Sequence, residues 1–177
     1  MQLTHVISTS QFDRRTLEKI FAVADKMEKL HKSHQPSKLL AGKIMAALFY
    51  EPSTRTRLSF ETAMLKLGGQ VISTENAAQF SSAAKGETLE DTIRVINSYT
   101  DVIVLRHYEQ GAAKVAADFS KVPVINAGDG PGEHPTQSIL DLYTFQKEMG
   151  NIDGLTFAFV GDSLYSRTNH SIVKLLA

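Results

Sequence analysis

The sequence contains no cysteine, which excludes disulfides, thiol nucleophiles and thiolate metal sites. It also has no net charge, because 19 basic residues balance 19 acidic ones. This balance gives no electrostatic reason to expect a nucleic acid or an anionic membrane as a partner. No apolar run approaches the length of about 18 residues that a membrane-spanning helix needs, and no signal-peptide pattern opens the chain. We therefore expect a cytoplasmic protein whose anion-binding sites are local clusters.

What the sequence does contain is a core-forming share of apolar residues, 42% of 177, arranged in short runs that alternate with helical patterns. This alternation predicts an α/β fold, with a parallel sheet covered by helices on both faces. We expect strands at residues 44–49, 71–74, 102–105, 122–125 and 155–160. We expect helices at residues 10–32, 53–67, 88–99, 109–119 and 135–149, the first of them with Ser10 and Asp13 as a capping pair.

The segment after the first strand organises the chain, because a buried strand leads directly into a helix there. Ser53 or Thr54 is the expected N-cap of this helix. Its first turn would offer unpaired backbone N–H groups, the hydroxyls of Thr54 and Thr56 and the Arg55 guanidinium to one anion. Arg55 and Arg57 lie two residues apart and point to different faces. We assign Arg55 to the anion and Arg57 to a structural role, although plain capping with a solvated arginine explains the short motif equally well.

Other charged residues follow the later strands, and ligands of open α/β sheets bind at the carboxyl ends of strands. Arg106 ends the third strand, where it faces either a ligand or solvent. His134 stands beside a helix that starts at Pro135, and the positive end of that helix favours a neutral imidazole. Such a ring can donate one N–H to a carbonyl oxygen, or it can serve only as a cap contact. Arg167 begins a further possible anion site, whereas His170 is interpreted as structural.

These motifs resemble those of the transcarbamoylases. Ser-Thr-Arg-Thr-Arg at 53–57, followed by Ser-Phe-Glu at 59–61, resembles their carbamoyl-phosphate motif. His-Pro-Thr-Gln at 134–137 resembles their second signature. Thr136, together with Lys-Gly-Glu at 85–87, resembles the aspartate carbamoyltransferases, since the ornithine enzymes usually carry cysteine at this place. The likeness extends over the whole chain, which stops about halfway through the family's usual length.

The resemblance implies transfer of the carbamoyl group from carbamoyl phosphate to the amino group of L-aspartate, in pyrimidine biosynthesis, without a metal or a cofactor. It implies a carbamoyl-phosphate-binding domain at residues 1–150. Residues 151–177 would be the first strand-helix unit of an incomplete aspartate-binding domain. Because that unit lacks the sheet it should join, we expect it to be poorly packed, exposed or swapped onto another copy.

The resemblance also implies a role for each candidate residue. Carbamoyl phosphate would be bound by Ser53, Thr54, Arg55, Thr56, Ser81, Arg106, His134 and Gln137. The catalytic residues would be Arg55, Thr56, Lys85, Arg106 and His134. Aspartate would be bound by Lys85 and Arg167. Ser81 and Lys85 would reach across from a neighbouring subunit, which implies a homotrimer with shared sites, and regulatory chains are a further possible partner.

Two alternatives remain open. A non-catalytic carbamoyl-phosphate-binding and trimerisation domain would carry the same motifs, and binding without formation of carbamoyl-aspartate would identify it. An ornithine-type enzyme would use ornithine in place of aspartate, and Thr136 argues against it. A P-loop nucleotide enzyme is not expected, because the Gly-x-x-x-x-Gly-Lys-Ser/Thr motif is nowhere present.

Overall fold

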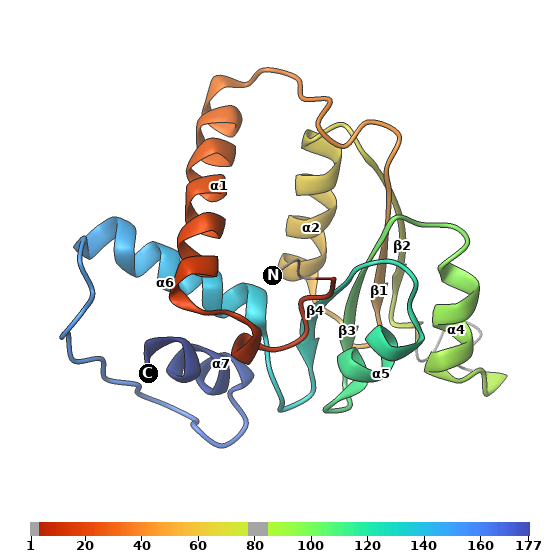
Figure 1. The fold of residues 1–177 in the computed structure, drawn as a ribbon. Coiled ribbons are helices and arrows are strands. Elements are labelled where there is room, and N and C mark those ends of the chain that lie inside the picture. The colour runs from red at the N-terminus through yellow and green to blue at the C-terminus, as the bar shows by residue number, and fades with distance from the viewer. Residues whose placement is uncertain (1–3, 78–84) are drawn as a thin grey trace.

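A computed structural model describes residues 4–77 and 85–177, with a four-stranded sheet at its centre (Figure 1). The strands are β1 (Ile44–Phe49), β2 (Gln70–Glu75), β3 (Val102–His107) and β4 (Val124–Asp129). Their order in the sheet is β2-β1-β3-β4, and all three pairs of neighbours are parallel. The expected parallel α/β fold is therefore confirmed.

Helices connect the strands and cover both faces of the sheet (Figure 1). They are the short 3-10 helix η1 (Thr9–Gln11), α1 (Arg14–Ser33), α2 (Thr54–Lys66), α4 (Leu89–Ile96), α5 (Ala112–Phe119), α6 (Pro135–Met149) and α7 (Arg167–Leu176). Helix α2 lies on one face, and α4 and α5 lie on the other. Within residues 4–77 and 85–177, no helix is long and apolar enough to cross a membrane.

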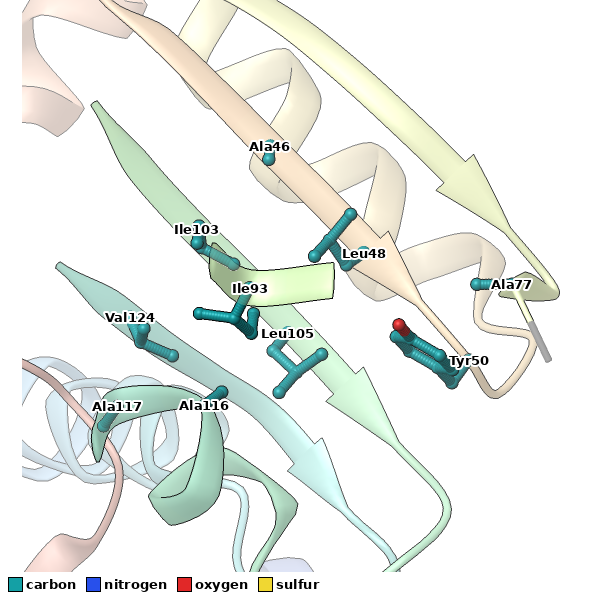
Figure 2. Packing of buried hydrophobic residues seen from close by; sticks show 10 residues of the cluster. All are labelled: Ala46, Leu48, Tyr50, Ala77, Ile93, Ile103, Leu105, Ala116, Ala117 and Val124. Carbon is teal, nitrogen blue, oxygen red and sulfur yellow. The ribbon is translucent and has the colours of Figure 1, made fainter. Parts of the chain in front are cut away.

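The central strand β1 shows why both faces must be covered, since successive side chains of a strand point to opposite sides. Ala46 and Leu48 pack with Ile93 of α4 in the cluster drawn in Figure 2. Phe49 belongs to a second cluster on the other face, with Met64 of α2. A third cluster lies between α1, α6 and α7, and its buried members are Leu17, Phe21, Leu142 and Ile172.

The fifth expected strand, residues 155–160, is wrong. This stretch has no regular secondary structure, and Val160 is 95% exposed. The apolar run had the composition of a strand, but a strand needs a hydrogen-bonded neighbour, and no described strand lies beside it. The helix after it does pack, contrary to our expectation, because Ser171 and Ile172 of α7 are buried against the rest of the molecule.

The N-terminal segment also differs from expectation. The Asp13 carboxylate accepts the N–H of Thr16 at 2.8 Å, so α1 begins after Asp13, and Ser10 is not its cap partner. Further upstream, Val6 forms a parallel bridge to β4: its N–H donates to the Val124 carbonyl and its carbonyl accepts from Asn126, both at 2.8 Å. These two bonds occupy the outer edge of β4 at Val124 and Asn126.

Candidate active site

Two guanidinium groups meet at one carboxylate beyond the carboxyl ends of the strands. Glu51 follows β1 by two residues, Arg106 lies at the end of β3, and Arg167 is the first residue of α7. One guanidinium nitrogen of Arg106 and one of Arg167 each lie 2.8 Å from Oε1 of Glu51, and a second nitrogen of Arg167 lies 3.2 Å from Oε2. The side chain of Arg106 is 12% exposed, that of Arg167 20% and that of Glu51 28%. Solvent therefore screens these ion pairs only partly.

Gly128, near the end of β4, lets the backbone approach both guanidinium groups. Its φ of +116° lies in the region that favours glycine. A Cβ atom added there would lie 2.7 Å from Nη1 of Arg167 and 3.5 Å from Nη1 of Arg106. The Arg106 guanidinium also donates to the Ala127 carbonyl at 3.4 Å, whereas its Nε is buried and has no hydrogen-bond partner among the described residues. One buried donor of Arg106 is therefore unpaired among the described residues.

His134 completes this cluster as a neutral imidazole. It is the N-cap of α6 and is 7% exposed. Burial lowers its pKa to about 4, with further lowering by the positive charges of Arg106 and Arg167. The sequence predicted a neutral ring but assigned the cause to the helix start, whereas burial is the larger cause here. Its backbone N–H donates to the hydroxyl of Ser171 at 2.9 Å, and its Nδ1 lies 3.4 Å from the Thr136 hydroxyl.

The residues at the start of α2 make no hydrogen bond or ion pair with this cluster among the described residues. Ser53 is the N-cap, as predicted, but its side chain makes no capping hydrogen bond. Thr54 and Arg55 are exposed and Thr56 is half-buried. Within residues 4–77 and 85–177, no hydrogen bond or ion pair links Arg55 to Glu51, the carboxylate that Arg106 and Arg167 share. Among the described residues, the side chains of Thr54, Arg55 and Thr56 form no hydrogen bond or ion pair.

Two other predicted side chains are engaged with carboxylates. Arg57 forms ion pairs with Glu61 at 3.1 Å and Glu75 at 2.9 Å, which agrees with the structural role predicted for it. The side-chain amide of Gln137 donates to Asp141 at 2.9 Å. This bond fixes the orientation of the amide, and it leaves the Gln137 oxygen as an acceptor.

The remaining predicted residues lie at or beyond the edge of what the structure describes. Ser81 falls outside the described residues, and Lys85 is the first residue after that gap, with an exposed side chain. No group of three or more histidines and carboxylates in the described ranges is arranged to hold a metal ion.

Sequence reasoning missed two carboxylates. Glu51 stands directly behind a buried strand, and the rule used for Arg106 would have found it. Glu133 gave no such signal, because its partners are distant in sequence. Its carboxylate accepts hydrogen bonds from Ser8 at 2.9 Å, from the backbone and hydroxyl of Thr9 at 2.8 and 2.7 Å, and from Lys174 at 2.7 Å.

The site thus consists of two guanidinium groups, a neutral imidazole and a close backbone approach at the carboxyl edge of a parallel sheet in an α/β domain. The cations attract a phosphate or a carboxylate, and a neutral imidazole can donate to a carbonyl oxygen without adding charge.

The chain belongs to the aspartate/ornithine carbamoyltransferase family. Residues 4–147 match the model of its carbamoyl-phosphate binding domain. The chain is 61% identical to the chloroplastic aspartate carbamoyltransferase of Arabidopsis thaliana, covering 99% of this chain and 45% of the relative. It is 56% identical to the aspartate carbamoyltransferase catalytic subunit of Methanocaldococcus jannaschii, covering 99% of this chain and 57% of the relative.

The fold is likewise that of solved aspartate transcarbamoylases. The enzyme of Trypanosoma cruzi, in a complex with carbamoyl phosphate and aspartate, superposes with a TM-score of 0.92 at 43% identity. That match covers 98% of this chain and 57% of the Trypanosoma chain. The chain thus spans about half the length of the relatives that it matches.

The expected cytoplasmic location is contradicted by the plant relatives. The proteins of Arabidopsis thaliana, Pisum sativum and rice, 56% to 61% identical to this chain, are named as chloroplastic enzymes. The prediction of a cytoplasmic protein was therefore wrong. It rested on composition, and a charge-balanced chain without cysteine suits the interior of a plastid as well as the cytoplasm.

Proposed function

We propose that this chain supplies the carbamoyl-phosphate half of an aspartate carbamoyltransferase. In the proposed reaction, the α-amino nitrogen of aspartate attacks the carbonyl carbon of carbamoyl phosphate. A C–N bond forms, the C–O bond to phosphate breaks, and the nitrogen loses a proton, giving N-carbamoyl-L-aspartate and phosphate. The observation that carries this proposal is the convergence of Arg106, Arg167 and neutral His134 at one edge of the sheet.

The phosphate is proposed to bind between the start of α2 and β3. The unpaired N–H groups of the first helical turn and the hydroxyls of Ser53 and Thr54 suit its oxygens. Arg55 is exposed and free to turn toward an incoming dianion. Arg106 is proposed to donate to a phosphate oxygen through its guanidinium, which in this structure contacts Glu51. Each of these donors stabilises the leaving phosphate more strongly as its negative charge grows.

The carbamoyl group is proposed to lie between His134, Thr56 and Arg106. A neutral ring donates one N–H to the carbonyl oxygen as negative charge develops there, and it does not repel the cations beside it. The Thr56 hydroxyl and the Arg106 guanidinium are proposed as the other donors to this oxygen. The carbamoyl NH₂ suits the oxygen of Gln137, since the nitrogen of that amide is already bonded to Asp141.

Arg167 is proposed to bind a carboxylate of aspartate. In this structure its guanidinium holds the carboxylate of Glu51 with two hydrogen bonds, which is the geometry that arginine uses for carboxylates in general. Glu51 therefore demonstrates on the chain itself what Arg167 can recognise. Together with this role, residues 1–150 are proposed as the carbamoyl-phosphate domain and residues 151–177 as the beginning of an aspartate domain.

The assembly is proposed to be a homotrimer with shared sites. Ser81 and Lys85 would complete a neighbour's site, with Lys85 binding aspartate and assisting loss of phosphate. Regulatory chains would be additional partners, as the name "catalytic subunit" of the Methanocaldococcus relative suggests.

Titration calorimetry with carbamoyl phosphate, together with an assay for carbamoyl-aspartate, tests the proposal on this chain. Replacing Arg106 with alanine is expected to lower turnover about 10²–10³-fold, by analogy with the loss of one donor from an oxyanion hole. Arg15→Ala serves as the control, because Arg15 is exposed on α1. If wild-type chain and both variants bind carbamoyl phosphate equally, or none binds it, the proposal is wrong.

A second candidate is a carbamoyl-phosphate-binding domain without activity of its own. It is favoured by one observation, that residues 4–147 match the family's carbamoyl-phosphate binding domain. Binding that is weakened by Arg106→Ala, without formation of carbamoyl-aspartate by the wild-type chain, would support this candidate over the enzyme.

A further inference from the structure

His170 contacts two backbone carbonyl groups at once. It lies on α7, three residues after Arg167. Its Nδ1 is 2.9 Å from the carbonyl oxygen of Pro131, and its Nε2 is 3.0 Å from the carbonyl oxygen of Ser163. Pro131 belongs to the loop that ends in His134, and Ser163 belongs to the segment that leads into Arg167. A single imidazole thus spans the two segments that carry these site residues.

The chemistry of the two contacts specifies the protonation state of the ring. A carbonyl oxygen only accepts hydrogen bonds, whereas a neutral imidazole has one donor nitrogen and one acceptor nitrogen. If the His170 ring were neutral, the lone pair of one nitrogen would face a carbonyl oxygen at about hydrogen-bond distance, which is repulsive. Both contacts are hydrogen bonds only when both nitrogens carry a proton. The geometry therefore fits an imidazolium.

We propose that His170 is a positioning residue, a cationic clamp that holds the Pro131 loop to the Ser163 segment and opens when the ring loses its proton. The effect of this clamp on catalysis rests on the roles proposed above for His134 and Arg167. The clamp itself is a property of this chain and can be measured without any substrate.

The charged groups around His170 permit this state. Lys174, one turn further along α7, disfavours a second positive charge, but its ammonium is paired with Glu133 of the facing loop at 2.7 Å. Arg167 on the same helix is turned to the carboxylate of Glu51. On the third side, the Asp162 carboxylate accepts two backbone N–H groups of the turn that follows it.

The direction of the pH dependence follows from these contacts. The carbonyl groups of Ser163 and Pro131 raise the pKa of His170 above the ordinary 6.5, and they outweigh the lowering by burial and by the charge of Lys174. Because the folded-state pKa is raised, the clamp is fully closed below about pH 6.5 and is lost as the pH rises through the folded-state value. The loop that ends in His134 should loosen over that interval.

Ring titration and amide exchange, both followed by NMR on the whole chain, test the clamp without a ligand. The N–H groups of residues 132–134 report on the loop, since each donates a hydrogen bond in the closed state. We expect His170 to titrate above 6.5 and the protection of these amides to fall about tenfold as it does, which corresponds to about 1.4 kcal/mol. Exchange must be compared as protection factors, because intrinsic exchange itself depends on pH.

Three variants separate a clamp from a general structural role. His170→Gln removes the titration and should leave the loop at low protection at every pH. His170→Arg keeps a permanent cationic donor and should hold the loop closed at high pH. His31→Gln is the matched control, because His31 is an exposed histidine in the last turn of α1, on another element, and it should behave like the wild type.

The outcomes are distinct. The proposal is overturned if His170 titrates at or below 6.5, or if His170→Gln shows the same pH-dependent protection as His31→Gln. It is supported if protection follows the titration of His170 and the arginine variant abolishes the pH dependence. Should carbamoyl phosphate bind, its affinity is expected to weaken about tenfold over the same interval in wild type but not in His170→Arg. A chain that fails to bind it refutes the proposed function, while the ligand-free data still decide the clamp.

Discussion

Replacing Glu51 with glutamine is expected to destabilise the fold and to create a new response to phosphate. The carboxylate carries hydrogen bonds from two guanidinium groups, and bonds of this kind contribute about 1.5–3 kcal/mol each when well shielded. All three side chains are partly exposed, which reduces that contribution toward the value for surface pairs, about 0–1 kcal/mol. We therefore expect the free energy of unfolding to fall by about 2 kcal/mol in Glu51→Gln.

Denaturant unfolding, with and without inorganic phosphate, measures both effects. In the variant, Arg106 and Arg167 lose their anion, so phosphate should stabilise it more than it stabilises the wild type. At a phosphate concentration ten times the dissociation constant, the gain would be about 1.4 kcal/mol. Glu18→Gln is the control, because its pair with Arg14 is at the surface and should contribute less than about 0.5 kcal/mol. A Glu51 variant as stable as this control and indifferent to phosphate would refute the reasoning.

The contribution of Glu51 to stability should also depend on pH. Burial raises the pKa of Glu51, but hydrogen bonds from Arg167 and Arg106 outweigh burial and lower the pKa overall below 4.5. The stabilisation is therefore present at neutral pH and is lost as the pH falls through the folded-state pKa. Wild type and Glu51→Gln should converge in stability under acid conditions, and a difference that persists unchanged there would contradict the assignment.

Further predictions concern Gly128, His134 and Glu133. Gly128→Ala should lower the free energy of unfolding more than Gly42→Ala does. Both glycines have positive φ, but only at Gly128 would the added methyl group meet the guanidinium groups. Equal free energies of unfolding for the two variants would show that the contact is unimportant. The His134 ring should remain neutral down to a pKa of about 4 when titrated by NMR. Because its pKa is lowered, the free energy of unfolding falls as the pH drops from about 6.5 to 4, where the unfolded chain binds the extra proton. Glu133→Ala should lower the free energy of unfolding by about 2 kcal/mol, because it leaves the donors to this carboxylate unpaired.

The sequence predicted those features that depend on neighbouring residues. The strand at 44–49, the helix after Ser53 and the Pro135 start of α6 are confirmed, because apolar runs and cap residues specify them locally. The same local signal misled at 155–160, where an apolar run was taken for a strand although no neighbouring strand bonds to it. Periodicity measures burial tendency and does not measure the presence of a partner.

Contacts between distant residues were beyond the reach of local patterns. Neither the bridge from Val6 to β4 nor the bond from His134 to Ser171 leaves a trace in spacing. The pairing of Glu51 with Arg106 and Arg167 could be half predicted, because both Glu51 and Arg106 follow parallel strands that are neighbours in the sheet. Which side chain would take the central place between two cations depends on packing that only the folded chain reveals.

The two outer strands of the sheet differ in what they offer to another chain. The outer side of β4 is bridged by Val6 through two hydrogen bonds, to Val124 and Asn126, whereas β2 has no strand beyond it in the described ranges and leaves Ile72 41% exposed. An incoming strand could therefore lengthen the sheet in one direction only, past β2. Growth by repeated edge-to-edge addition needs two accepting edges, so this asymmetry limits such pairing to a single step.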